Sequence, residues 1–218
     1  LEGLNNKYIN SEKLRVFFQS AQKNKTQILK KKKKWITFVG KLNKAKGYDI
    51  FGKSIIKILN KNPSWSAKIV GDEKREKIDL KHKNVDKLGF VNHKKVLSIY
   101  KQTSIAVVCS RWEEPFGRTS LEASANGCAV IISNKGGLPE TITNAIVLKN
   151  LSVNELCKQI NFLITNLEAR KKYQKLSIEN FFLTHKYVTN LIDQYRDEKI
   201  KKINIFNTTN ASKKLRIM

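Results

Sequence analysis

No run of apolar residues in this sequence approaches the roughly 18 that a membrane-spanning helix needs, so we predict no membrane span. The first seven residues, LEGLNNK, lack the apolar core of a signal peptide. An initiator methionine is also absent, and we therefore interpret the chain as a fragment or a processed product. Its 218 residues suffice for one domain with a real core and flanking segments.

Cysteine and histidine are scarce and scattered. The cysteines are odd in number, lie in apolar surroundings and form no pair at metal-ligand spacing. We interpret them as small buried residues in a reducing compartment, which favours a cytoplasmic location. The histidines do not suggest a metal site either, and no Asp-x-Asp metal motif is present, so no metal or cofactor is expected. The residues concerned are Cys109, Cys128, Cys157, His82, His93 and His185.

Acidic residues are few compared with basic ones, 18 against 43, which gives a net charge of +25. Lysine is spread along the whole chain together with abundant Asn and Ile, a mixture that an AT-rich coding sequence produces. Only Lys30 to Lys34 form a block. Attraction to an anionic membrane surface, as a peripheral protein at the inner face, stays open as an alternative. There is no zinc finger, aromatic platform or evident recognition helix, so specific nucleic-acid binding is not expected.

Short apolar strands alternate with helices from Trp35 to Val147, a pattern that predicts an α/β fold with a doubly wound parallel sheet. We expect strands at 35–39, 66–70, 85–88, 105–109, 129–133 and 145–147, and helices at 48–60, 94–101, 118–126, 153–166, 167–175 and 181–198. Residues 35–198 then form one Rossmann-like domain with a helical C-terminal segment.

The flanking segments are less regular. Residues 1–34 are expected to be the tail of another domain, with a strand at 14–18 and a polar, basic linker at 21–34. Residues 199–218 are expected to be a polar tail, in which 214–218 could begin a further strand.

The segment from Glu114 to Glu122 carries the chemistry. Two carboxylates stand eight residues apart, with a Pro-Phe-Gly turn and the first turn of a predicted helix between them, directly after a buried strand. Ligands bind at such strand ends in open α/β sheets. The N–H groups and the positive end of a helix suit phosphate, and flanking carboxylates suit the hydroxyl groups of a ligand whose middle is a diphosphate.

Four blocks in order and spacing, over roughly residues 35–196, resemble the donor-binding, C-terminal half of a retaining glycosyltransferase of the GT-B fold, family four type. They are Phe38-Val-Gly-Lys41 with Lys46-Gly47; Gly71-Asp72; Ser110 followed by Glu114-Pro-Phe-Gly-Arg-Thr-Ser-Leu-Glu-Ala123; and Gly127-Cys-Ala-Val-Ile-Ile with Gly136-Gly-Leu-Pro-Glu140.

The resemblance implies roles for several charged residues. Glu114 would face hydroxyls of the donor sugar, and Glu122 would accept hydrogen bonds from the ribose diol. Lys41 and Lys46 would neutralise the diphosphate, although the family usually has Arg at the first position, so Lys41 is a departure. The neighbouring Glu113 is interpreted as an ordinary solvated acid.

The resemblance also implies the residues that contact the nucleotide. Gly89, Phe90 and Val91 match a loop beside the nucleobase, and Gly136 to Glu140 match a loop near the sugar. Arg118, where the family usually has an aliphatic residue, either adds charge to the phosphate site or lies on the surface. The further residues expected around the phosphates are Gly40, Gly47, Phe116, Gly117 and Thr119.

The function implied is transfer of a sugar from a nucleotide diphosphate sugar, with retention at the anomeric carbon and without a metal or a protein nucleophile. The acceptor would be a glycan, a lipid-linked intermediate or a small molecule. Such enzymes have an N-terminal acceptor domain of similar size, for which residues 1–34 are too few, so we expect nucleotide binding but no transfer by this chain alone. The alternatives are a non-catalytic nucleotide-sugar binding module and a basic nucleic-acid or membrane-surface protein.

Overall fold

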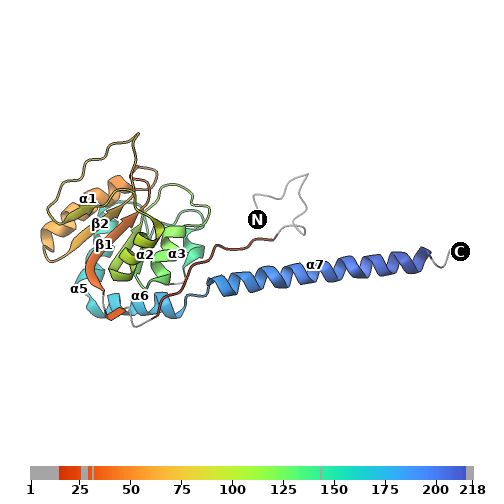
Figure 1. Cartoon of the computed structure of the whole chain (residues 1–218). Helices are drawn as coiled ribbons and strands as arrows, with labels where there is room; N and C mark the ends of the chain where they lie inside the picture. Colours follow the sequence, from red (N-terminus) through yellow and green to blue (C-terminus); the bar gives the residue numbers. More distant parts are fainter. Residues whose placement is uncertain (1–14, 26–28, 31, 143, 215–218) are drawn as a thin grey trace. The chain divides into compact units, whose positions relative to one another are not determined.

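The computed structural model describes residues 15–25, 29–30, 32–142 and 144–214 (Figure 1). The chain divides into two compact units. One spans Ala21–Phe182, and the other comprises Leu1–Ser20 together with Leu183–Met218. No helix among the described residues combines the length and the apolar character needed to cross a bilayer.

The larger unit is built on a parallel sheet. Within the described residues its strands are β1 (Lys33–Val39), β2 (Ser66–Val70), β3 (Val85–Lys87), β4 (Thr103–Val108), β5 (Ala129–Ile132) and β6 (Ala145–Val147). Their order is β3-β2-β1-β4-β5-β6, and every neighbouring pair is parallel. The predicted doubly wound parallel sheet is therefore confirmed.

Helices cover both faces of this sheet (Figure 1). On one face, α1 (Tyr48–Lys61) and α5 (Val153–Thr165) bury an apolar core against Ile36 and Phe38 of β1. On the other, α2 (His93–Gln102) and α3 (Arg118–Ala125) bury a second core against Val70 and Val108. The remaining helices of the unit are α4 (Leu138–Thr141) and α6 (Leu167–Glu179).

The strand order reverses between β1 and β4. From β1 the chain moves outward through β2 and β3, then returns to β4 on the other side of β1 and continues outward through β5 and β6. The loops that leave the carboxyl ends of β1 and β4 therefore diverge and open a crevice. The structure thus places the β1–α1 loop and the Glu114–Glu122 segment side by side, since both follow these two strands.

Most predicted boundaries agree with the structure to within two residues, but the C-terminal helices are longer than expected. The helix α6 continues to Glu179, and the helix expected at 181–198 begins at His185 instead and, as α7 (His185–Lys214), extends through most of the predicted polar tail. No Gly or Pro occurs after Pro139 to stop a helix there. The further strand considered at 214–218 is wrong for Lys214, which is helical. Residues 215–218 lie outside the described part.

The strand expected at 14–18 is wrong for the residues that the structure describes, because 15–18 adopt no regular structure, and Leu14 lies outside them. In the smaller unit, Phe17 packs edge-on against Tyr195 of α7, with ring centroids 5.7 Å apart. Ser20 Oγ lies 2.8 Å from His185 Nδ1.

The basic segment before the sheet is partly anchored to the larger unit. Asn24 N donates to Ala125 O at 2.9 Å. The ammonium group of Lys32 donates to the backbone oxygens of Tyr100 and Asn126 at 2.9 and 2.6 Å, and burial lowers its pKa. The last residues of the predicted linker, from 33 onward, already belong to β1. Part of the basic block therefore helps to build the domain.

Candidate functional site

Two cavities adjoin at the carboxyl ends of the central strands. The first, of about 220 Å³, is lined by Phe38, Val39, Gly40, Lys46, Val108, Ser110, Glu114, Gly117, Arg118 and Thr119. The second, of about 270 Å³, is lined by Val39, Gly40, Lys41, Val70, Gly71, Asp72, Phe90, Val91 and Val96. Because each is below the roughly 300 Å³ of a typical ligand pocket, and because they share Val39 and Gly40, the pair suits one elongated ligand.

The β1–α1 loop depends on a glycine at its end. Gly47 begins α1 with φ of 72°, and a Cβ atom there would collide with the backbone oxygen of Cys109. Cys109 is fully buried, and burial raises the pKa of its thiol to about 12, so it is an inert packing residue. The close approach of Gly47 to the end of β4 fixes the position of the preceding Lys46.

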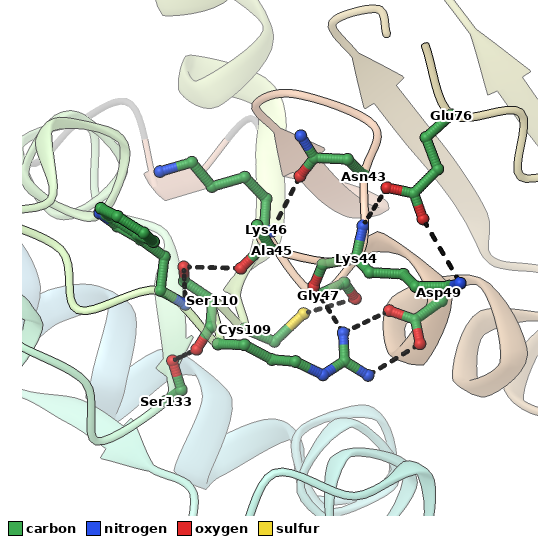
Figure 2. A network of polar contacts seen from close by, with 12 residues as sticks. Asn43, Lys44, Ala45, Lys46, Gly47, Asp49, Glu76, Cys109, Ser110 and Ser133 are labelled. Carbon is green, nitrogen blue, oxygen red and sulfur yellow. Dashed lines mark hydrogen bonds and ion pairs between the residues drawn. The ribbon is translucent and has the colours of Figure 1, made fainter.

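A polar network holds the same loop from the β4 side (Figure 2). The backbone oxygen of Ala45 accepts from Arg111 N at 2.9 Å, from Trp112 N at 3.1 Å and from Ser110 Oγ at 3.2 Å. Ser110 O in turn accepts from Ser133 Oγ at 2.7 Å. These hydrogen bonds connect the β1–α1 loop with the ends of β4 and β5 next to the first cavity, which Lys46 and Ser110 line.

An ion pair completes this network. The guanidinium of Arg111 donates to both carboxylate oxygens of Asp49, at 2.6 and 2.8 Å, and these hydrogen bonds lower the pKa of Asp49. Asn43 Oδ1 accepts from Lys46 N at 3.0 Å, and Glu76 accepts from Lys44 N at 3.1 Å (Figure 2). The backbone around Lys46 is therefore fixed before any ligand arrives.

Lys46 and Glu114, predicted separately to contact the donor, lie in direct contact. Lys46 Nζ is 2.6 Å from Glu114 Oε1, and both side chains line the first cavity. Only 13% of the Glu114 side chain is exposed, so its charge needs this partner. Lys41 lines the second cavity instead, is exposed and forms no hydrogen bond or ion pair with any residue that the structure describes.

The turn between β4 and α3 presents free backbone donors. Gly117 begins α3 with φ of 95°, and a Cβ atom there would collide with Leu138. No acceptor among the described residues receives the N–H groups of Arg118, Thr119 or Ser120, and no side chain caps the helix. With the positive end of the helix dipole, these groups make the first cavity a site for an anion. Phe116, also predicted here, is buried beneath the turn.

Glu122 lies one turn further along α3 and is largely buried, with 7% of its side chain exposed. Its Oε1 accepts from Arg118 Nε at 2.8 Å and lies 2.9 Å from His93 Nε2. The sequence left open whether Arg118 serves the phosphate site or lies on the surface. In the structure Arg118 lines the first cavity, but its side chain donates to Glu122. His93, dismissed on sequence grounds, is the residue that sequence reasoning missed at this site.

The second cavity is bounded by the loops after β2 and β3. Gly71 approaches Gly40 so closely that a Cβ atom would strike its backbone oxygen, and Gly71 N donates to Gly89 O at 2.9 Å. Phe90, 81% exposed, and Val91 line the cavity, and their contact with a nucleobase stays a prediction. Gly89 itself shapes the turn, with φ of 63°.

The loop at Gly136 packs on the backbone of the Glu114 turn. Gly137 N donates to Glu114 O at 2.7 Å. Glu113 accepts from Lys135 Nζ at 2.8 Å and from Gly136 N at 2.5 Å, and the Lys135 bond, with that of Gly136 N, lowers the pKa of Glu113. The Glu113 side chain is 66% exposed, in agreement with the interpretation as a solvated acid, and its hydrogen bonds also link it to this loop.

The fold is the Rossmann-like domain that forms the C-terminal half of GT-B glycosyltransferases. A family model described as glycosyl transferases group 1 matches residues 19–179, most of the 218-residue chain, and the chain belongs to this family.

Curated relatives extend beyond this chain. It is 28% identical over 187 residues to spore coat protein SA of Bacillus subtilis, covering 77% of this chain and 50% of that protein. It is 37% identical over 123 residues to an uncharacterised glycosyltransferase of Methanocaldococcus jannaschii, covering 52% of this chain and 30% of that protein. The chain thus spans half or less of the length of these relatives.

Solved structures share the fold. The C-terminal domain of a glycosyl transferase group 1 family protein from Francisella tularensis is 26% identical, with a TM-score of 0.60, over 75% of this chain and 93% of that one. HepE of Anabaena, solved in complex with UDP-glucose, gives a TM-score of 0.72 at 17% identity, over 87% of this chain and 58% of that one.

Proposed function

We propose that this chain is the donor-binding half of a retaining glycosyltransferase and binds a nucleotide diphosphate sugar across the two cavities. The carrying observation is the first cavity, where Lys46, Glu114 and the uncapped start of α3 meet. The family match supports the reaction class, and the Anabaena neighbour, whose structure contains UDP-glucose, supports the donor class.

In this proposal the diphosphate occupies the first cavity. The leaving diphosphate gains negative charge as the bond to the sugar breaks. Lys46, Lys41 and the N–H groups of Arg118 and Thr119 stabilise that charge, and the loop network sets the backbone position of Lys46 in advance. The phosphates compete with Glu114 for Lys46, and sugar hydroxyls then become the partners that the Glu114 carboxylate requires.

The nucleoside would occupy the second cavity. Phe90 presents an exposed aromatic ring to the base, and Glu122, between its two partners, accepts from the ribose diol. We propose that transfer requires the N-terminal acceptor domain of the full-length protein, and that the acceptor is a glycan, a lipid-linked intermediate or a small molecule. Peripheral attraction of the basic chain to anionic membranes stays a prediction.

Calorimetric titration of the chain with UDP, GDP and ADP tests the proposal. One diphosphate should bind selectively, and Glu122→Ala should weaken it by about 1–3 kcal/mol, because those hydrogen bonds involve a charged group. Glu179→Ala, which removes an exposed carboxylate that forms an ion pair with Lys175, serves as the control and should leave binding unchanged. Absence of binding to a folded sample, or equal binding by both variants, contradicts the proposed site.

Two further assays separate the alternatives. Sugar transfer after addition of an N-terminal domain distinguishes an enzyme half from a non-catalytic binding module, and the anomeric configuration of the product tests retention. Tight binding to duplex nucleic acid or anionic vesicles that falls steeply with salt would favour the basic surface protein instead.

A further inference from the structure

Glu122 receives both of its side-chain contacts on one oxygen. Arg118 Nε and His93 Nε2 approach Oε1 at 2.8 and 2.9 Å, whereas Oε2 receives no hydrogen bond from any residue that the structure describes. Since a carboxylate only accepts, His93 presents its Nε2–H to Glu122. The contacts orient the carboxylate and leave its second oxygen for another donor.

The two partners hold Glu122 from different elements. Arg118 stands one helical turn before Glu122 on the same helix, is 65% exposed and lines the first cavity, where an anion would attract its long side chain. His93 comes from the first turn of α2, a short side chain on a helix fixed by the buried Val96 and Tyr100. A diphosphate that draws Arg118 away would leave His93 as the group that keeps Glu122 in place.

Neighbours of His93 line the two cavities, although neither His93 nor Glu122 lines one itself. Val91 and Val96, on either side of it in the sequence, line the second cavity, and Arg118, its co-partner on Glu122, lines the first. The ribose of a nucleoside diphosphate connects the base to the phosphates, and in the proposed function Glu122 accepts from its diol.

We infer that His93 is a positioning residue that fixes the Glu122 carboxylate for the ribose diol and thereby sets the preference of the site for ribonucleotides over 2′-deoxyribonucleotides. This inference rests on the proposed function. A purely structural His93 would affect stability, or affinity for both kinds of nucleotide equally, whereas a positioning role changes the ratio of the two affinities.

The test is calorimetric titration of the 218-residue chain with whichever of UDP, GDP and ADP binds most tightly, and with its 2′-deoxy counterpart. The wild type should prefer the ribonucleotide by about tenfold, the loss expected when a charged acceptor finds no hydroxyl. His93→Ala and His93→Leu should both reduce the preference to about threefold or less, because the carboxylate is no longer oriented. His93→Leu keeps the bulk of the side chain. If one of the two variants fails to fold, the other still tests the inference.

Two further variants sharpen the test. His93→Gln keeps an N–H donor on a side chain of similar length and should restore the preference. His82→Ala removes an imidazole whose hydrogen-bond partners among the described residues are Asn60 and Asn84; it lines neither cavity, and the variant should match the wild type.

The outcomes separate the two proposals. Binding with a ribonucleotide preference that His93→Ala and His93→Leu leave intact overturns this inference alone, as does wild-type binding without any preference. Failure of every diphosphate to bind the folded wild type overturns the proposed function and this inference with it.

Discussion

The helices of the larger unit begin in two different ways. α2, α5 and α6 each start after a residue whose side chain accepts a backbone N–H three positions on, at 2.8 to 3.2 Å; these residues are Asn92, Ser152 and Asn166. α3 starts at Gly117, has no such cap and leaves its first three N–H groups without an acceptor among the described residues. A side-chain cap occupies the group that a phosphate would take, so α3 keeps its donors for a ligand.

A glycine in the left-handed conformation at the start of a helix is not sufficient to leave the first N–H group of that helix without an acceptor. α1 also begins at such a glycine, Gly47, but its first N–H, that of Tyr48, donates to Asn43 O at 3.1 Å. The first N–H of α1 is therefore occupied and this loop serves to place Lys46, whereas none of the first three N–H groups of α3 has an acceptor among the described residues. One loop is a rigid support, and the other provides the backbone donors.

The largest expected effect comes from a substitution that disrupts the β1–α1 loop. Gly47→Ala forces a left-handed backbone on an L-residue and drives a Cβ atom into the Cys109 carbonyl, so we expect a loss of about 4 kcal/mol or more in the free energy of unfolding. Urea denaturation measures it. Gly52→Ala, in the same helix and with its new Cβ in ordinary contact with Leu80, should instead stabilise by about 0.5–1 kcal/mol. Equal effects of the two changes would show that the loop is not constrained as described.

A smaller effect separates the two lysines of the site. Lys46→Ala removes both the proposed phosphate partner and the partner of Glu114, and we expect it to weaken diphosphate binding by about 1–3 kcal/mol. Lys41→Ala removes an exposed charge that has no ion-pair partner in the described part of the chain, and it should cost less, about 0.5–1 kcal/mol. Calorimetric titration at one fixed salt concentration compares the two variants. A larger loss of affinity for Lys41→Ala would indicate that the phosphates lie nearer the second cavity.

The smallest effect tests the capped helices. Ser152→Ala and Asn166→Ala should each lower the free energy of unfolding by about 1 kcal/mol, the usual value of an N-cap. Neither should change nucleotide affinity, because both caps lie outside the two cavities. A change in affinity that accompanies either substitution would mean that these helix ends take part in binding.

Much of the fold was predictable because short apolar runs, nearly all of them followed by Gly, Asp or Ser, mark the strands, and the structure places β2 and β6 where the pattern predicts. The length of α7 was not, since polar composition was mistaken for the end of a helix where no Gly or Pro stops one. The lysine-rich composition also gave no sign that Lys32 has a structural role, because its hydrogen bonds to Tyr100 and Asn126 depend on segments distant in sequence.

The candidate site also has parts that the sequence predicts and parts that it does not. Glu114, Lys46 and the α3 turn are adjacent because parallel strands bring their carboxyl ends to one edge, which strand order and motif position indicate. The contact of His93 with Glu122 depends on how α2 packs beside α3, and no spacing in the sequence encodes that. That Asn92 caps α2 directly before His93 was the one local sign of a helix start there.

The most direct test of the contrast between open and capped helices is a ¹H–¹⁵N correlation spectrum of the chain titrated with the diphosphate that binds best. The backbone amides of Arg118, Thr119 and Ser120 should shift strongly as they gain a phosphate acceptor, while those of Glu155 and Ala169, already bonded to Ser152 and Asn166, stay in place. Unmoved amides at the start of α3 in a sample that binds nucleotide would contradict the account.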